Sequence, residues 1–180
     1  TVGRRPGRGA RGADGRALSE ALARISRLSG TEAAISFRCD GETLARASSA
    51  AAFAPLSSAF TPDHIVYAGH EFLLAEDQGS IEAAWADFVR RNGNAPRIIV
   101  VKGLGAFACA KSPAAAGTAL ILFTDACKVA VYAESFGGAQ HMTKEKIDFI
   151  RNWEVEKYRS SVNAGNSRES GRTRTGHGDS

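Results

Sequence analysis

The spacing of apolar residues along this chain of 180 residues changes several times, and each change predicts a new element. Apolar residues within 18–28 recur at intervals of three and four, which predicts an amphipathic helix that a Ser-Gly pair ends. Residues 33–38 predict a strand, and Asp40-Gly41 predicts a turn after it. Residues 45–60 are rich in Ala and Ser, which indicates a loop with one weak helical turn.

The following segment is predicted to be extended. Pro62 disfavours helical backbone at the residue before it, so the chain should enter this segment in an extended conformation. Residues 65–67 and 72–74 are apolar runs on either side of Gly69, which is typical of a hairpin or a bulged strand. Ser80 then predicts the cap of a helix with one apolar face.

The most regular pattern is a strand, a glycine break, a second strand and a long helix. Residues 98–101 are a continuous apolar run, which suits a strand buried on both faces. Glycines interrupt the run at 103–105, and residues 106–110 resume it. Ser112-Pro113 predicts the cap and first position of the helix. Its buried face should carry Leu120, Phe123, Cys127 and Val131.

Strands that alternate with helices predict an α/β fold in which helices cover both faces of a sheet. Thr143 predicts the cap of a last helix, and the glycine pair before it suggests that this helix leaves the main body. We therefore expect one domain at residues 17–162. The flanking residues 1–16 and 163–180 are polar and glycine-rich, which predicts disordered tails.

Charge is concentrated in the first tail. Residues 1–16 hold five arginines and one aspartate, a net charge of +4, which equals the net charge of the whole chain. The tail has no interleaved aromatic residues and no nucleic-acid-binding motif, so we expect a solvated end and no nucleic-acid partner. No apolar segment follows the arginines as in a secretory signal. No apolar run approaches the ~20 residues that span a bilayer, so no membrane partner is expected.

The cysteines indicate the compartment. Cys39, Cys109 and Cys127 are odd in number, widely spaced and set in apolar surroundings. This pattern favours buried, reduced thiols in a cytoplasmic protein.

Histidine is the side chain that most often supplies metal ligands and acid–base groups near neutral pH. His64 and His70 flank one short apolar run, and they could share a site only if Gly69 folds the chain back. Glu71 could orient an imidazole or act as a base. His64, His70 and Glu71 are therefore the candidate catalytic residues. The structural alternative is that Asp63-His64 caps a turn and that His70-Glu71 only decorates a hairpin.

The glycine break supplies the candidate substrate-binding residues, Lys102, Gly103 and Gly105. A lysine beside bare backbone can hold a phosphate or a carboxylate, although a solvated lysine and tight packing are the structural alternatives. The break also resembles a truncated dinucleotide fingerprint. That motif needs a helix opening at the glycines, whereas a strand intervenes here and the acidic Asp125 falls inside the following helix.

Three segments together resemble the class II aldolase/adducin family. They read TPDHIVYAGHEFLL at 61–74, RIIVVKGLGAFACAKSPAAAG at 97–117, and FGG followed by IDFIRNWEVEKYR within 136–159. The chain is most similar to the aldolase-like region of long proteins in which such a domain precedes a short-chain dehydrogenase. The likeness covers roughly residues 31–160.

The resemblance implies a three-layer α/β/α sandwich that forms a homo-oligomer. It also implies a divalent metal, typically zinc, which three histidines hold while a hydroxy-ketone sugar phosphate is cleaved. Two of those histidines form a His-x-His pair that this chain lacks, and Leu104 stands at the place of the third. No metal ligand therefore transfers by position. The chain is either the later portion of a larger domain or a member that kept the fold and lost the metal.

Three functions remain open at this point. The first is a carbon–carbon lyase acting on a small sugar or sugar phosphate. The second is a non-catalytic, oligomer-forming domain of the same fold. The third is a nucleotide-dependent oxidoreductase that uses the glycine break.

Overall fold

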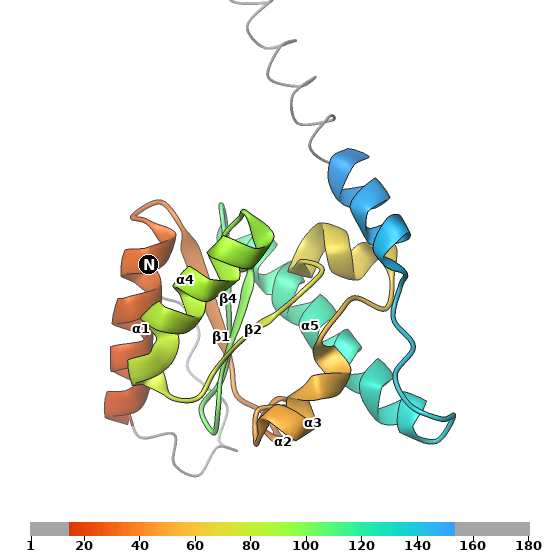
Figure 1. Cartoon of the computed structure of the whole chain (residues 1–180). Coiled ribbons are helices and arrows are strands. Elements are labelled where there is room, and N and C mark those ends of the chain that lie inside the picture. The colour runs from red at the N-terminus through yellow and green to blue at the C-terminus, as the bar shows by residue number, and fades with distance from the viewer. Residues whose placement is uncertain (1–14, 154–180) are drawn as a thin grey trace, which may run out of the picture. The chain divides into compact units, whose positions relative to one another are not determined.

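The computed structural model describes residues 15–153, which belong to two compact units, Thr1–Met142 and Thr143–Ser180. A mixed sheet in the order β1-β4-β3-β2 forms the centre of the first unit (Figure 1). Strands β2 and β3 are parallel, whereas β3 with β4 and β4 with β1 are antiparallel. The strands are β1 (Ala34–Arg38), β2 (Leu73–Ala75), β3 (Ile98–Val101) and β4 (Gly105–Ala110).

Helices cover both faces of this sheet, as predicted. Helices α1 (Gly15–Ser29) and α4 (Ile81–Asn92) lie on one side in Figure 1, and α5 (Pro113–Glu134) lies on the other. Successive side chains of β3 point to opposite faces of the sheet, and Ile98 and Val100 belong to the core beneath α5. Ile99 and Val101 belong to the core shared with α1 and α4. The predicted strands at 98–101 and 106–110 and the three-layer α/β/α architecture are confirmed.

The start of α5 is confirmed, and one residue of its predicted face is wrong. The Ser112 hydroxyl accepts a hydrogen bond from the Ala115 amide at 3.2 Å, and Pro113 occupies the first turn. Leu120, Phe123 and Cys127 are buried, but Val131 is 47% exposed. The buried face of α5 contains several alanines, and near its end Ala130 packs in the core in place of Val131.

Helix α5 is also the one helix within residues 15–153 that could cross a membrane by length and composition. This differs from the sequence expectation that no apolar run approaches such a length. Its inner face packs on the sheet and fills the core there, which is how the central helix of a globular domain passes the same test.

The predicted hairpin at 65–74 is wrong. Residues 62–68 are helical, and His64–Ala68 (η2) forms a short π-helix. The Thr61 hydroxyl accepts a hydrogen bond from the His64 amide at 3.3 Å. Thr61 thus caps a helical turn with Pro62 at its first position, a start signal that the apolar runs obscured. Gly69 ends the turn with φ of 97°, and only then does β2 begin.

Residues 45–60 contain more helix than predicted. Helices α2 (Gly41–Arg46) and α3 (Ala50–Phe53) are followed by a 3₁₀ turn, η1 (Ala54–Leu56). Asp40 accepts from the Thr43 amide at 2.8 Å and Ser49 from the Ala52 amide at 3.1 Å, so both helices have side-chain caps. Another 3₁₀ turn, η3 (Gln78–Ser80), precedes α4, and Asp77 rather than Ser80 provides the capping box there.

The second unit is described at residues 143–153. Residues 144–153 are helical, and the Ile147 amide donates to the Thr143 carbonyl at 3.0 Å, so the predicted last helix is confirmed. Residues 15 and 16 of the expected first tail already belong to α1. The rest of that tail and the tail expected at 163–180 lie outside the described residues.

Candidate functional site

His64 is a buried residue of η2 whose side chain contacts helix α5. Its side chain is 0% exposed, and its Nε2 lies 3.2 Å from Oδ2 of Asp125 on α5. Its Nδ1 is buried and has no hydrogen-bond partner among the described residues. The imidazole therefore links two elements on the α5 side of the sheet.

His70 and Glu71 belong to a different network. The His70 Nε2 lies 3.0 Å from Oδ1 of Asn92, the last residue of α4. The Asn92 amide group donates to Oε2 of Glu71 at 3.0 Å, and Arg91 donates to the other carboxylate oxygen. The structure thus brings His70 and Glu71 together at the end of α4, on the opposite side of the sheet from α5.

This placement does not suit the family's metal. His64 and His70 pair with helices on opposite faces of the sheet, and Leu104 is buried in the core. Within residues 15–153, no three His, Cys, Asp or Glu side chains are grouped so that they could hold a metal ion. The described residues therefore offer no site for zinc, and the catalytic roles of His64, His70 and Glu71 remain predictions.

The residues of the glycine break also have local partners. Lys102 Nζ lies 2.8 Å from Oε2 of Glu76, and the Gly103 amide donates to the Ala47 carbonyl at 3.0 Å. Gly105 has φ of 141°, and a Cβ built on it would lie 2.5 Å from the Arg38 carbonyl oxygen of β1. Glycine is thus needed at 105 for the close approach of two strands.

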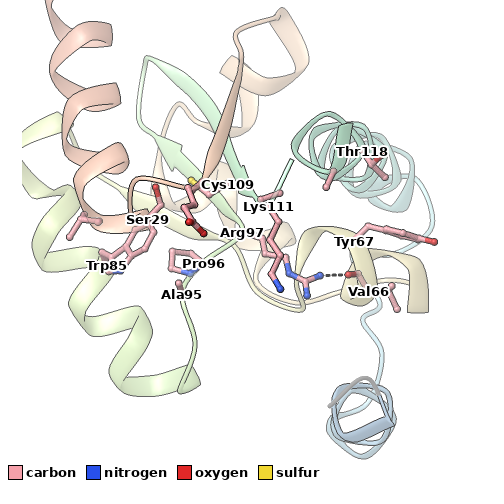
Figure 2. A pocket seen from close by; sticks show the side chains of 15 residues that line it. Ser29, Val66, Tyr67, Trp85, Ala95, Pro96, Arg97, Cys109, Lys111 and Thr118 are labelled. Atoms are coloured by element: carbon pink, nitrogen blue, oxygen red, sulfur yellow. Dashed lines mark hydrogen bonds between the residues drawn. The ribbon is translucent and has the colours of Figure 1, made fainter. Parts of the chain in front are cut away.

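A pocket of about 840 Å³ opens at the other end of the sheet (Figure 2). It lies between the two helical layers, since Trp85 of α4 lines it on one side and Thr118 of α5 on the other. The chain entering β3 and the chain leaving β4 form the wall between them. A pocket of this size can hold a small organic molecule.

Two cationic residues and a phenol line this pocket. The Cys109 amide donates to the Arg97 carbonyl at 2.9 Å, which places Lys111, two residues further on, next to Arg97. The Arg97 guanidinium donates to the Val66 carbonyl in η2, as Figure 2 shows, and this bond orients it. Tyr67 follows in η2 and also lines the pocket, although its hydroxyl points away from Arg97 and Lys111 in Figure 2. The arrangement suits a ligand that carries an anionic group and hydroxyls.

The three cysteines are free thiols, as predicted, but only Cys127 is buried, whereas Cys39 and Cys109 are half-buried. Desolvation raises the pKa of Cys109, which lines the pocket, to about 11, against a smaller lowering effect of a hydrogen bond with Ser29. Desolvation likewise raises the pKa of Cys127 to about 12. The reactive thiolate form is therefore scarce near neutral pH.

Sequence reasoning missed the pocket residues Arg97, Lys111 and Tyr67. A usable signal was present, because Arg97 directly precedes one buried strand and Lys111 directly follows the next. If two consecutive strands pair in antiparallel, the start of the first meets the end of the second, so these cations should lie together.

Comparison with known proteins gives the fold. No model of a protein family and no curated protein matches this chain. Among solved structures it is similar to YgbL of Escherichia coli, a proposed aldolase, epimerase or decarboxylase, with 14% identity and a TM-score of 0.52. It is also similar to an aldolase II superfamily protein of Pseudomonas syringae, with 13% identity and a TM-score of 0.51. This chain has the class II aldolase fold.

The likeness extends over most of this chain but less of the other two proteins. It covers 75% of this chain and 65% of YgbL, and 86% of this chain and 62% of the Pseudomonas syringae protein. The chain thus spans less than two thirds of the length of either class II aldolase-fold protein. At these identities the comparison establishes the architecture, and the chemistry has to be argued from this chain's own residues.

Proposed function

We propose that this chain is a class II aldolase-fold domain that binds a small sugar or sugar phosphate in the pocket at the Arg97 end of the sheet. We further propose that it does not act by itself as a metal-dependent lyase. The observation that carries the proposal is the meeting of Arg97 and Lys111 in one cavity lined by residues of both helical layers. The separation of His64 from His70 supports the second part.

The lining residues divide the binding work by chemistry. A guanidinium has five N–H donors in a planar fork, and Arg97 uses one of its terminal nitrogens on the Val66 carbonyl. Its fork and the Lys111 ammonium would bind the phosphate or carboxylate. Thr118 would exchange hydrogen bonds with sugar hydroxyls, and Trp85 adds apolar surface for the carbon skeleton.

Calorimetric titration with ribose 5-phosphate, ribose and inorganic phosphate tests the proposal. We expect the phosphate ester to bind best, because it uses both the cations and the hydroxyls. Arg97→Ala should weaken it by roughly ten- to a hundredfold, since a hydrogen bond to a charged group contributes about 1.5–3 kcal/mol. Lys102→Ala is the matched control at the other end of the sheet. Equal affinity of wild type and Arg97→Ala would contradict the proposal.

A carbon–carbon lyase is the second candidate, favoured by the fold and by the description of YgbL. The test is incubation with zinc and a hydroxy-ketone phosphate, followed by detection of the two carbonyl products. We expect no zinc-dependent cleavage above background. Cleavage that disappears in both His64→Asn and His70→Asn would establish the lyase and reject our proposal that the chain is no metal-dependent lyase.

Two further functions were open from the sequence, a non-catalytic oligomer-forming domain and a nucleotide-dependent oxidoreductase. A non-catalytic role in a homo-oligomer, located in the cytoplasm, is consistent with a domain that only binds. The nucleotide-dependent oxidoreductase has less support, since Gly105 packs directly against β1. A dinucleotide at 100 times its dissociation constant would stabilise the fold by about 2.7 kcal/mol, and we expect no such stabilisation.

A further inference from the structure

The outer face of α5 exposes large apolar side chains. Ile121 is 61% exposed and Tyr132 is 68% exposed, and Val131 lies beside Tyr132. Ile121 lies about three helical turns from Val131 and Tyr132, so the apolar side chains mark the two ends of this face. The sheet covers the inner face of the same helix, so the outer face is a separate surface.

The charges on this face make it complementary to itself. Ile121, Asp125, Lys128 and Tyr132 are spaced four, three and four residues apart, so they form one stripe along the helix. The stripe reads apolar, acidic, basic, apolar in one direction and apolar, basic, acidic, apolar in the other. The midpoint between Asp125 and Lys128 is also the midpoint between Ile121 and Tyr132.

We infer that this stripe is a twofold interface at which α5 packs antiparallel against α5 of a second copy of the chain. A twofold axis through the midpoint would place Ile121 against Tyr132 of the second copy. It would also place Asp125 of each copy against Lys128 of the other, so that two ion pairs form across the axis. An isologous contact of this kind requires a self-complementary surface, and the stripe has that property. The inference does not depend on the pocket.

The buried His64 orients Asp125, the acidic residue of the stripe. The Asp125 side chain is 56% exposed, and its Oδ2 lies 3.2 Å from Nε2 of the buried His64. A carboxylate already oriented by a buried partner loses less freedom when it pairs across an interface. The charges also argue against a lipid surface as the occupant, because Lys128 and the exposed part of the Asp125 carboxylate would have to leave water.

Sedimentation equilibrium of the full chain at micromolar concentrations tests the inference. We expect a dimer whose dissociation constant rises at least tenfold in Ile121→Asp. The control is Ala86→Asp, which places the same charge on the exposed side of α4. Circular dichroism verifies that both variants are folded. A monomeric wild type, or equal dissociation constants for the two variants, would overturn the inference.

Charge reversal supplies a second, independent test. Lys128→Glu makes the middle of the stripe wholly acidic, and Asp125→Lys makes it wholly basic, so each variant alone should be monomeric. A mixture of the two should form a heterodimer, since the opposite charges again meet across the twofold axis. Failure of the mixture to associate would overturn the inference. Binding of the monomer to phosphatidylcholine vesicles would overturn it in favour of a lipid surface.

Discussion

The two ends of the central sheet carry similar residues and use them differently. At one end, Lys102 pairs with Glu76, and Gly105 lies against the carbonyl of Arg38. At the other end, Arg97 and Lys111 line an open pocket. A cation beside a strand end therefore indicates a ligand site only where the surrounding elements leave a cavity.

The comparison also explains why the glycine break drew attention first. Glycines at a strand end are typical both of ligand loops and of strands that approach closely. Here the close approach of β1 accounts for Gly105. The pocket lies at the opposite end, where no glycine marks it.

Substituting Gly105 should have the largest effect on the comparison. A methyl group in Gly105→Ala would lie 2.5 Å from the Arg38 carbonyl oxygen, on a backbone with φ of 141°. We expect the free energy of unfolding to fall by about 4 kcal/mol. The midpoint of thermal unfolding should accordingly fall by roughly 10 °C. Urea denaturation and a thermal scan measure the two quantities.

Gly103→Ala is the matched control for that experiment. Its φ is 70°, but a Cβ there would meet nothing within 4 Å. Only the left-handed backbone is penalised, at about 1 kcal/mol. Equal losses in the two variants would mean that backbone strain, and not the contact with β1, makes Gly105 necessary.

At the pocket end of the sheet, Cys109 should make the free energy of unfolding depend on pH in alkaline solution. The pKa of Cys109 is about 11 in the folded chain and 9.0 for an ordinary thiol, because burial disfavours the thiolate. Below pH 9 the Cys109 thiol keeps its proton in both the folded and the unfolded state, so its contribution to stability does not change with pH. Between pH 9 and 11 the unfolded chain loses its proton first, and stability should fall by about 2 kcal/mol.

Comparison of wild type with Cys109→Ala isolates this thiol from the lysines and tyrosines that titrate in the same range. The difference in unfolding free energy between the two proteins should change across pH 9–11 and stay constant at lower pH. Rapid alkylation of Cys109 by iodoacetamide in the folded protein at pH 7 would contradict the burial on which this expectation rests.

The smallest effect is expected from Lys102→Ala. Its partner Glu76 and Lys102 itself are both well exposed, so the ion pair contributes less than about 0.5 kcal/mol. Sugar phosphate affinity should be unchanged. A marked loss of affinity would reverse the comparison and place the ligand at the glycine break, where the sequence first suggested it.

The sequence predicted β3 and α5 well because clear local signals mark them. Residues 98–101 are uniformly apolar, which indicated a buried strand, and Ser112-Pro113 marked the start of α5. The η2 segment was predicted wrongly because apolar runs on both sides of Gly69 imitated a hairpin and obscured the helix start at Thr61-Pro62.

The candidate site was harder to predict than the fold. The partners of His64 and His70 lie 61 and 22 residues away in sequence, so spacing alone could not reveal that each imidazole is already engaged. The missing His-x-His pair and Leu104 can be seen in the sequence itself, which is why no metal ligand could be assigned by position. The pocket depends on side chains from several separate elements, which only the folded arrangement brings together.

The order of strands has a consequence for the folding route. Strands β2 and β3 join through α4 within a short stretch of chain, whereas β1 pairs with β4 in a register that sets Ala34 opposite Ala110. Closing that long loop loses more chain entropy, so β1 should dock late, after the transition state has formed. A conservative truncation such as Ile35→Val should then accelerate unfolding and leave the refolding rate nearly unchanged.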